Sequence, residues 1–231
     1  MIKSYVINLE RHKDRLEKFY KQNQTPSFER VNAIDKSVLT ALGYEKFYFN
    51  TSALENKIHR KITIGEIACT LSHILCWNKI ASDDELLEKE YALIAEDDII
   101  LSENFCAIIK NLIDKINDLD IDYKLIILHK LDLYHFSHKI KEDGQYHLIN
   151  ASTSEDIDND GSALYLLRKD KAIELVEFLK EKKPFWLADH FSTFCPDKVG
   201  ILFPFIGYIN ETIPSDLEIE RTIARQNAGI A

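Results

Sequence analysis

Three consecutive carboxylates, Glu96, Asp97 and Asp98, directly follow a short apolar run, Tyr91 to Ala95. A run of this length is typical of a buried strand. The carboxylates at its end cannot all be buried without partners, because an unpaired charge in an apolar interior is very costly. Hard divalent cations prefer such oxygen ligands, and Mg²⁺ binds one or two carboxylates together with substrate phosphates. The residues alone leave two explanations open: a metal site, or acids that complement the dipole of a following helix.

A second candidate pair, Asp189 and His190, follows the aromatic residues Phe185 and Trp186 and precedes an expected short helix. An aspartate in this setting can act as a general base, and a histidine can contact a metal or a phosphate. A plainer explanation stays open, in which Asp189 only caps the helix. His73 also has a plainer explanation, because a histidine beside an apolar helix face is usually a satisfied core residue.

The elements that position these groups begin with a strand, a helix and a second strand, over residues 4–9, 11–21 and 28–34. This order is typical of a βαβ unit in a parallel sheet. Ligands of such sheets bind outside the carboxyl ends of the strands. We therefore expect the polar residues near these ends to line one rim, where an arginine binds a phosphate, an aspartate binds a nucleoside and the acids bind a divalent ion. These residues are Asn8, Arg11, Arg15, Asp35 and the acids at 96–98.

Helical spacing and strand-length apolar runs outline the rest of the chain. Thr63 and Glu66 form a capping-box signature, which predicts a helix that runs to about Ala81. Ser102 is expected to cap a second long helix. Further helices are expected over residues 38–42 and 169–182, and strands over residues 123–128, 146–149, 161–167 and 200–206. The polar segment 129–160 is otherwise irregular, and acceptor specificity is a role that we expect for it.

No repeat or linker divides the chain. We expect one α/β domain over residues 1–210, with a Rossmann-like, mostly parallel central sheet flanked by helices, and a polar surface tail over residues 211–231. An apolar content of 45% and a charged content of 29% predict a folded core. The net charge of −9 argues against non-specific binding of nucleic acids, which needs a cationic surface.

The chain lacks the sequence signals of several other classes. No apolar segment approaches the ~20 residues that span a bilayer, and no signal peptide is evident, so we expect a cytoplasmic protein. Cys69 and Cys76 would lie roughly 10 Å apart on one helix, too far for a disulfide. With Cys106 and Cys195 they form no metal-ligand spacing, so we expect four buried thiols. A dinucleotide-binding glycine motif and a P-loop are both absent.

Taken in order, six motifs resemble glycosyltransferase family 25, the lipooligosaccharide biosynthesis galactosyltransferases of Gram-negative bacteria. The resemblance covers residues 4 to 195. It implies a GT-A-type fold, a UDP-sugar donor, usually UDP-galactose, and a divalent cation, usually Mn²⁺, with Mg²⁺ as the second choice. It also implies an inverting transfer that forms a β-linked sugar. The motifs are Tyr5–Arg15, Phe28–Asp35, Gly65–His73 with Trp77, Ala92–Asp98, Gly161–Tyr165 and Asp189-His190.

The resemblance also suggests a role for each candidate residue. Asp189 is the expected catalytic base. The expected metal ligands are Asp97, Asp98 and His190. The expected donor-binding residues are Asn8, Arg11, Arg15, Asp35, Ser72, His73, Glu96 and Asp97.

The expected acceptor is a lipid-linked oligosaccharide. Its lipid suggests peripheral contact with the inner face of the inner membrane, through the basic cluster at residues 57–61. Two other functions remain as alternatives: a metal-dependent phosphohydrolase that uses the same acids, and an inactive saccharide-binding protein with the same fold.

Overall fold

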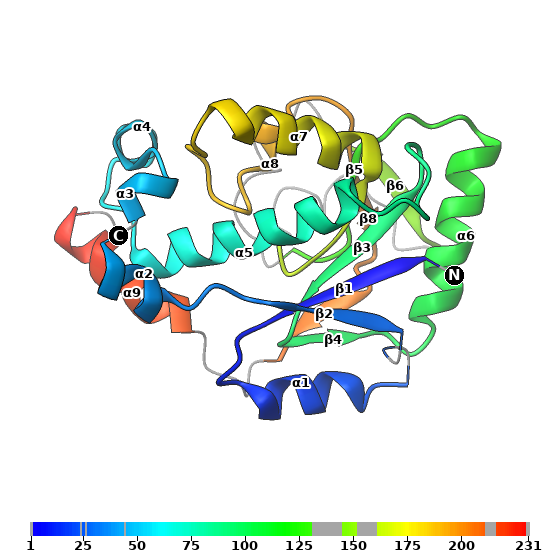
Figure 1. Ribbon diagram of the computed structural model, residues 1–231. Coiled ribbons are helices and arrows are strands. Elements are labelled where there is room, and N and C mark those ends of the chain that lie inside the picture. Colours follow the sequence, from blue (N-terminus) through cyan, green and yellow to red (C-terminus); the bar gives the residue numbers. More distant parts are fainter. Residues whose placement is uncertain are drawn as a thin grey trace.

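A seven-stranded sheet runs through the middle of the computed structural model, which describes residues 2–23, 25, 27–43, 45–130, 145–151, 161–210 and 216–229. Its strand order is β2-β1-β3-β7-β5-β8-β6 (Figure 1). A second sheet pairs β4 (Ile99–Leu101) with β9 (Gly207–Ile209). The strands of the large sheet are β1 (Lys3–Asn8), β2 (Phe28–Asn32), β3 (Tyr91–Glu96), β5 (Leu125–Ile127), β6 (His147–Asn150), β7 (Leu164–Arg168) and β8 (Val199–Phe203).

The α/β fold class is confirmed, but the large sheet is mixed rather than mostly parallel. β1 runs parallel to β2 and β3, and β5 runs parallel to β8. β7 lies antiparallel between β3 and β5, and β6 is antiparallel to β8. All five residues of β7 are buried. A strand that is buried on both faces is apolar throughout in either direction, so its sequence does not reveal the direction.

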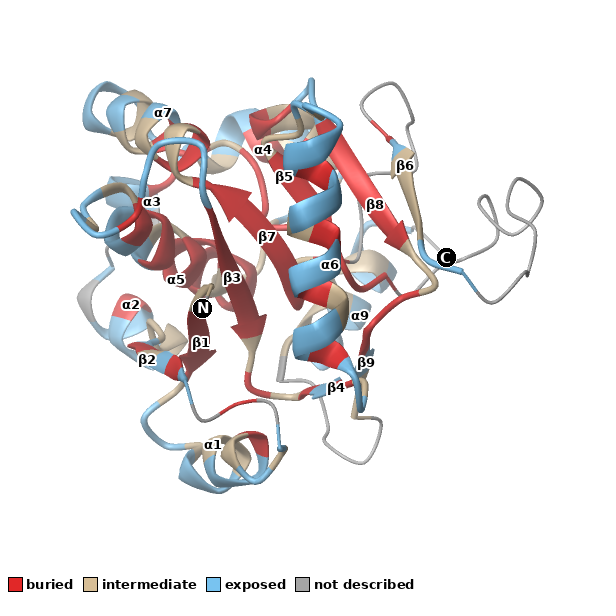
Figure 2. Ribbon diagram, turned by 90° about the vertical axis from the view of Figure 1, so that its right-hand side faces the viewer, coloured by how far each residue is buried: buried red, intermediate tan, exposed pale blue. Residues whose placement is uncertain are grey.

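Helices cover both faces of the large sheet. α5 (Ile64–Ala81) and α7 (Lys169–Glu181) share one core with Ala92 and Ile94. α1 (Lys13–Tyr20) and α6 (Phe105–Asp118) share the other core with Leu93 and Ala95. Figure 2 shows buried strands behind α6, whose outer face is exposed. Because side chains alternate along β3, its last residue, Glu96, and the next residue, Asp97, point toward different helices.

Local signals mark some helix ends and miss others. The predicted capping box is confirmed: Thr63 Oγ1 accepts from the Glu66 N–H, and Glu66 Oε2 accepts from the Thr63 N–H. The prediction for Ser102 is wrong, because the N-cap of α6 is Asn104. The segment after β2 holds α2 (Lys36–Leu42), α3 (Glu45–Tyr48) and α4 (Thr51–Ile58), of which only α2 was indicated.

The predicted polar tail, residues 211–231, contains a helix. Residues Asp216–Asn227 form α9, which packs against the start of α5. Glu220 Oε2 accepts from the Gly65 N–H at 3.2 Å, and Arg221 Nε donates to Glu66 Oε1 at 3.0 Å. Much of the irregular segment, residues 131–144 and 152–160, lies outside the described residues.

None of the four cysteines forms a disulfide, as predicted, but they are not all buried. Cys106 is exposed and Cys69 is half-buried, whereas Cys76 and Cys195 are buried. No helix among the described residues is long and apolar enough to cross a membrane.

The central strand supplies a test of the fold. Ile94 is fully buried and pairs with both β1 and β7. We expect Ile94→Ala to lower the free energy of unfolding by about 2–5 kcal/mol, through lost burial and the cavity left behind. Urea denaturation measures this change. Leu87→Ala is the control, since Leu87 is 68% exposed and its loss should cost less than about 0.5 kcal/mol. Equal effects of the two substitutions would contradict the proposed core.

Candidate functional site

Two hollows open at opposite ends of the same strands. One, of about 1980 Å³, lies at the amino ends of β1, β2 and β3. The other, of about 730 Å³, lies at their carboxyl ends, where ligands of open α/β sheets bind. The second, called the cleft below, also gathers most of the predicted donor-binding residues. Its polar lining includes Arg11, Arg15, Ser72, His73, Glu96, Asp97 and Asp98.

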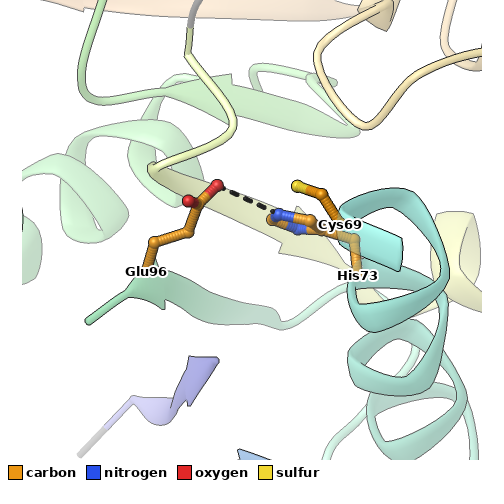
Figure 3. A group of neighbouring side chains, drawn as sticks. All are labelled: Cys69, His73 and Glu96. Carbon is orange, nitrogen blue, oxygen red and sulfur yellow. Dashed lines mark hydrogen bonds and ion pairs between the residues drawn. The ribbon is translucent and has the colours of Figure 1, made fainter. Parts of the chain in front are cut away.

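Glu96 reaches from β3 toward α5. His73 Nε2 lies 3.3 Å from Glu96 Oε1, and Ser162 Oγ donates to the same oxygen at 3.2 Å. Figure 3 shows the carboxylate of Glu96 facing His73, with Cys69 one helical turn before His73. Burial raises the pKa of Glu96, whereas the hydrogen bonds from His73 and Ser162 and the charge of Arg221 act to lower it. Glu96 thus presents its carboxylate to the cleft.

Asp97 turns toward the opposite face of the sheet. Its Oδ2 accepts from Asn8 Nδ2 at 2.5 Å, and its Oδ1 lies 3.7 Å from Arg15 Nη1 on α1. Burial raises the pKa of Asp97, and the hydrogen bond from Asn8 and the charge of Arg15 only partly offset this effect. The divergence of Glu96 and Asp97 is the one that strand alternation predicts.

Asp98 lies in the turn between β3 and β4 and is the least compensated of the three acids. Burial raises its pKa to about 7, and the charges of Glu96 and Asp97 add to this effect. Its Oδ1 is buried and has no hydrogen-bond partner among the described residues. An uncompensated buried carboxylate oxygen beside two other acids suits a hard divalent cation, so the residues present fit the expected metal. The helix-dipole alternative does not hold, because β4 separates these acids from α6.

The other predicted donor-binding residues are Arg11, Asp35 and Ser72, which make contacts with the segments beside the cleft. Arg11 lines the cleft and pairs with Asp35. Asp35 also accepts from the Ser37 N–H as the N-cap of α2, so part of its hydrogen-bonding capacity is already used. Ser72 accepts from the Ile34 N–H at 2.9 Å, which ties α5 to the segment after β2.

Asp189 and His190 lie outside the lining of the cleft. Both are buried, and the N-cap position of α8 (Phe191–Phe194) belongs to His190, which excludes Asp189 as a simple cap. Asp189 Oδ2 lies 3.6 Å from Arg221 Nη2. Asp189 Oδ1 is buried and has no hydrogen-bond partner in the described part of the chain. A buried carboxylate oxygen of this kind calls for an explanation beyond packing.

A model of glycosyltransferase family 25 (LPS biosynthesis protein) matches residues 1–189, which include the carboxyl ends of β1, β2 and β3. The chain belongs to glycosyltransferase family 25. The match ends at Asp189, so α9 lies beyond the part that defines the family.

Curated relatives agree with this membership. The lipooligosaccharide biosynthesis protein lic2B of Haemophilus influenzae is 37% identical over 105 residues, or 44% of this chain and 35% of that protein. Human procollagen galactosyltransferase 2 is 33% identical over 131 residues, or 54% of this chain and 20% of that protein. The matches thus span about a third or less of these relatives. The crystal structure of the galactosyltransferase LgtC with donor and acceptor sugar analogues aligns with 87% of this chain, and 73% of that chain is covered. The TM-score is 0.40 at 12% identity.

In this family 25 chain, residues of α9, which the sequence analysis missed, and two residues of the motif Gly161–Tyr165, to which it gave no individual role, complete the surroundings of the cleft. Leu217 of α9 lines it, and Arg221 of α9 contacts both Glu66 and Asp189. Ser162 and Tyr165 contact Glu96 and His73, respectively. Leu217, Glu220 and Arg221 lie on one side of a helical turn, but only Leu217 is apolar, so hydrophobic periodicity gave little signal for α9.

The cluster around Glu66 holds this arrangement together. The Glu66 side chain is fully buried and accepts from Arg60, at 2.5 and 2.9 Å, as well as from Arg221. Burial raises the pKa of Glu66, yet the hydrogen bonds from Arg60 and the Thr63 N–H, together with the charge of Arg221, lower it to about 2.

This pKa shift predicts how stability depends on pH. A carboxylate with a lowered pKa in the folded state stabilises the protein above its unfolded pKa of 4.5, and the contribution disappears as the pH falls toward 2. We expect Glu66→Gln to lower the free energy of unfolding by about 3 kcal/mol at pH 7, and by progressively less below pH 4.5. Denaturant titrations of both proteins between pH 7 and 3 test this. A difference that does not vary with pH would exclude the ionised cluster.

Proposed function

We propose that this chain transfers a hexose, specifically galactose, from a UDP-sugar to a saccharide hydroxyl of a lipooligosaccharide-type acceptor, with inversion to a β-linkage. One observation carries the proposal. At the carboxyl ends of β1, β2 and β3, three acids of one strand end share a cleft with Arg11 and Arg15. A ligand that joins a diphosphate to a divalent cation satisfies both signs of charge.

Each side chain contributes a distinct task to this proposal. Arg11 and Arg15 bind the diphosphate, because guanidinium groups match phosphate oxygens in geometry and charge. Asp97 and Asp98 hold the cation, Mn²⁺ or Mg²⁺, and Asn8 fixes the orientation of Asp97. When bound, the cation neutralises charge that develops on the departing diphosphate. Asp35, held by Arg11 at the rim, is the proposed contact of the nucleoside.

Asp189 is the proposed base. An inverting transfer needs a group that removes the proton of the acceptor hydroxyl on the face opposite the leaving group. Arg221 Nη2 lies 3.6 Å from Asp189 Oδ2, and Oδ1, which has no hydrogen-bond partner among the described residues, is the proposed proton acceptor. His190, which lies outside the cleft lining, remains a predicted third metal ligand.

The relatives supply the substrate class in this proposal. One is named for lipooligosaccharide biosynthesis and another for galactosyl transfer. A lipid-linked acceptor would bring the chain to a membrane surface, where the predicted contact through residues 57–61 would operate. A GT-A-type fold, a cytoplasmic location and peripheral contact with the membrane belong to the same proposal.

The metal assignment predicts a specific loss of binding. We expect Asp98→Ala to abolish the Mn²⁺-dependent part of UDP binding, since it removes the acid with the least compensation. Titration calorimetry with UDP, with and without Mn²⁺, measures this. Asp84→Ala removes an exposed acid away from the cleft and serves as the control. Unchanged Mn²⁺-dependent binding in Asp98→Ala would sink the metal assignment.

The base assignment predicts the opposite pattern. We expect Asp189→Asn to lower transfer by about 10²-fold or more, the scale of general-base catalysis, while UDP binding persists. UDP release in the presence of a saccharide acceptor measures turnover, and calorimetry measures binding. Near-normal turnover would remove Asp189 from this role.

Two other functions make different predictions in the same assay. A phosphohydrolase would cleave simple phosphate esters without an acceptor, and an inactive saccharide-binding protein would release no UDP at all. A panel of UDP-sugars with Mn²⁺, followed with and without a lactose- or heptose-type acceptor, separates them. The proposed transferase requires release that depends on the acceptor.

A further inference from the structure

His73 lies between a buried hydrogen-bond network and the first acid of the cleft. Its Nδ1 is 2.9 Å from Tyr165 Oη, and Trp77 Nε1 donates to that same oxygen at 2.9 Å. On the other side of the ring, Nε2 faces Glu96 Oε1 at 3.3 Å. His73 is 1% exposed, and Trp77 and Tyr165 are fully buried. Bulk solvent therefore does not reach the Tyr165 hydroxyl.

The position of each proton follows from the chemistry of these groups. An indole N–H can only donate, whereas a phenol has one proton to give. In the described part of the chain, Tyr165 Oη has two hydrogen-bond partners, Trp77 and His73. Because Trp77 cannot accept, the Tyr165 proton must go to His73 Nδ1. That nitrogen is then the acceptor, and the single ring proton of His73 lies on Nε2.

The alternative protonation states each leave a group unsatisfied. If His73 carried a proton on Nδ1, as an imidazolium or as the other tautomer, the Tyr165 hydroxyl would be a buried donor without an acceptor. If Nε2 bound a metal, its proton would have to move to Nδ1, with the same result. Cys69, His73 and Glu96 offer donor atoms within 4.8 Å of one another, as in a Zn²⁺ site. A metal bound by these three residues is disfavoured, because it would leave the Tyr165 hydroxyl without an acceptor.

We propose that His73 is a positioning residue: a neutral Nε2–H donor, fixed in this tautomer by Trp77 and Tyr165, that holds one oxygen of Glu96. Ser162 binds the same oxygen, Oε1, so both contacts leave Oε2 for a ligand in the cleft. The consequence for donor binding rests on the proposed function, whereas the tautomer itself does not.

Nitrogen NMR of the ligand-free protein tests the tautomer directly. Long-range ¹H–¹⁵N spectra of ¹⁵N-histidine-labelled protein at pH 7 distinguish both tautomers and the imidazolium, and the loss of one spin system in His73→Gln assigns the signal. We expect a protonated Nε2 and an unprotonated Nδ1, unchanged by stoichiometric Zn²⁺. A protonated Nδ1, or loss of the Nε2 proton on addition of Zn²⁺, would overturn the proposal.

Two substitutions test the positioning role. His73→Gln keeps a neutral N–H donor at the place of Nε2, and His73→Leu removes it. We expect His73→Leu to lower UDP affinity in the presence of Mn²⁺ by about tenfold or more, because it removes a hydrogen bond to a charged group. We expect His73→Gln, which keeps the donor, to lower this affinity by no more than about threefold. Equal losses would contradict a donor role. If the wild-type protein binds no UDP, the proposed function fails, and the NMR result still decides the tautomer.

Discussion

Strand alternation at the end of β3 is the constraint on which the site depends. Successive side chains of a strand point to opposite faces, so a run of three acids cannot present itself to one helix. Glu96 goes to α5, where His73 holds it, and Asp97 goes toward α1, where Arg15 lies. Asp98 lies in the turn, and within the described residues its Oδ1 has no hydrogen-bond partner. The sheet thus places negative charge between two helices, and each helix orients one acid.

A second cluster of charges, around Glu66, connects the start of α5 to α9. Glu66 serves the capping box of α5 and also accepts from Arg60 and Arg221. A buried carboxylate needs such compensation, because its charge is otherwise strongly destabilising. Arg221 also contacts Asp189, with Nη2 3.6 Å from Oδ2. One guanidinium from outside the family match therefore links the start of α5 to the proposed base.

The sequence was informative where a signal is local. The capping box, the amphipathic α6 and the apolar β3 each occupy a contiguous stretch with a clear period, and these elements were predicted. The direction of β7 was not, because a strand buried on both faces has the same pattern either way. The contacts of Arg221 and Tyr165 join residues far apart in the sequence, and no single-sequence pattern encodes such pairs. Asp35 illustrates a partial success: it follows β2 as expected, yet its contact with Ser37 arises because it caps α2. Its pairing with Arg11 joins two segments that are distant in the sequence.

The arginines and the acids of the cleft together restrict which ligand can bind, because their charges are opposite. Arginines alone would bind many anions, and acids alone would bind many cations. Placed together, the acids repel a phosphate that arrives without a cation, and Arg15 repels a cation that arrives without a phosphate. A cation already bound to a diphosphate satisfies both sides at once, so the pair is recognised better than either part. This recognition also requires that Glu96 be held in place, and the proposed neutral His73 does so without adding a positive charge to the cleft.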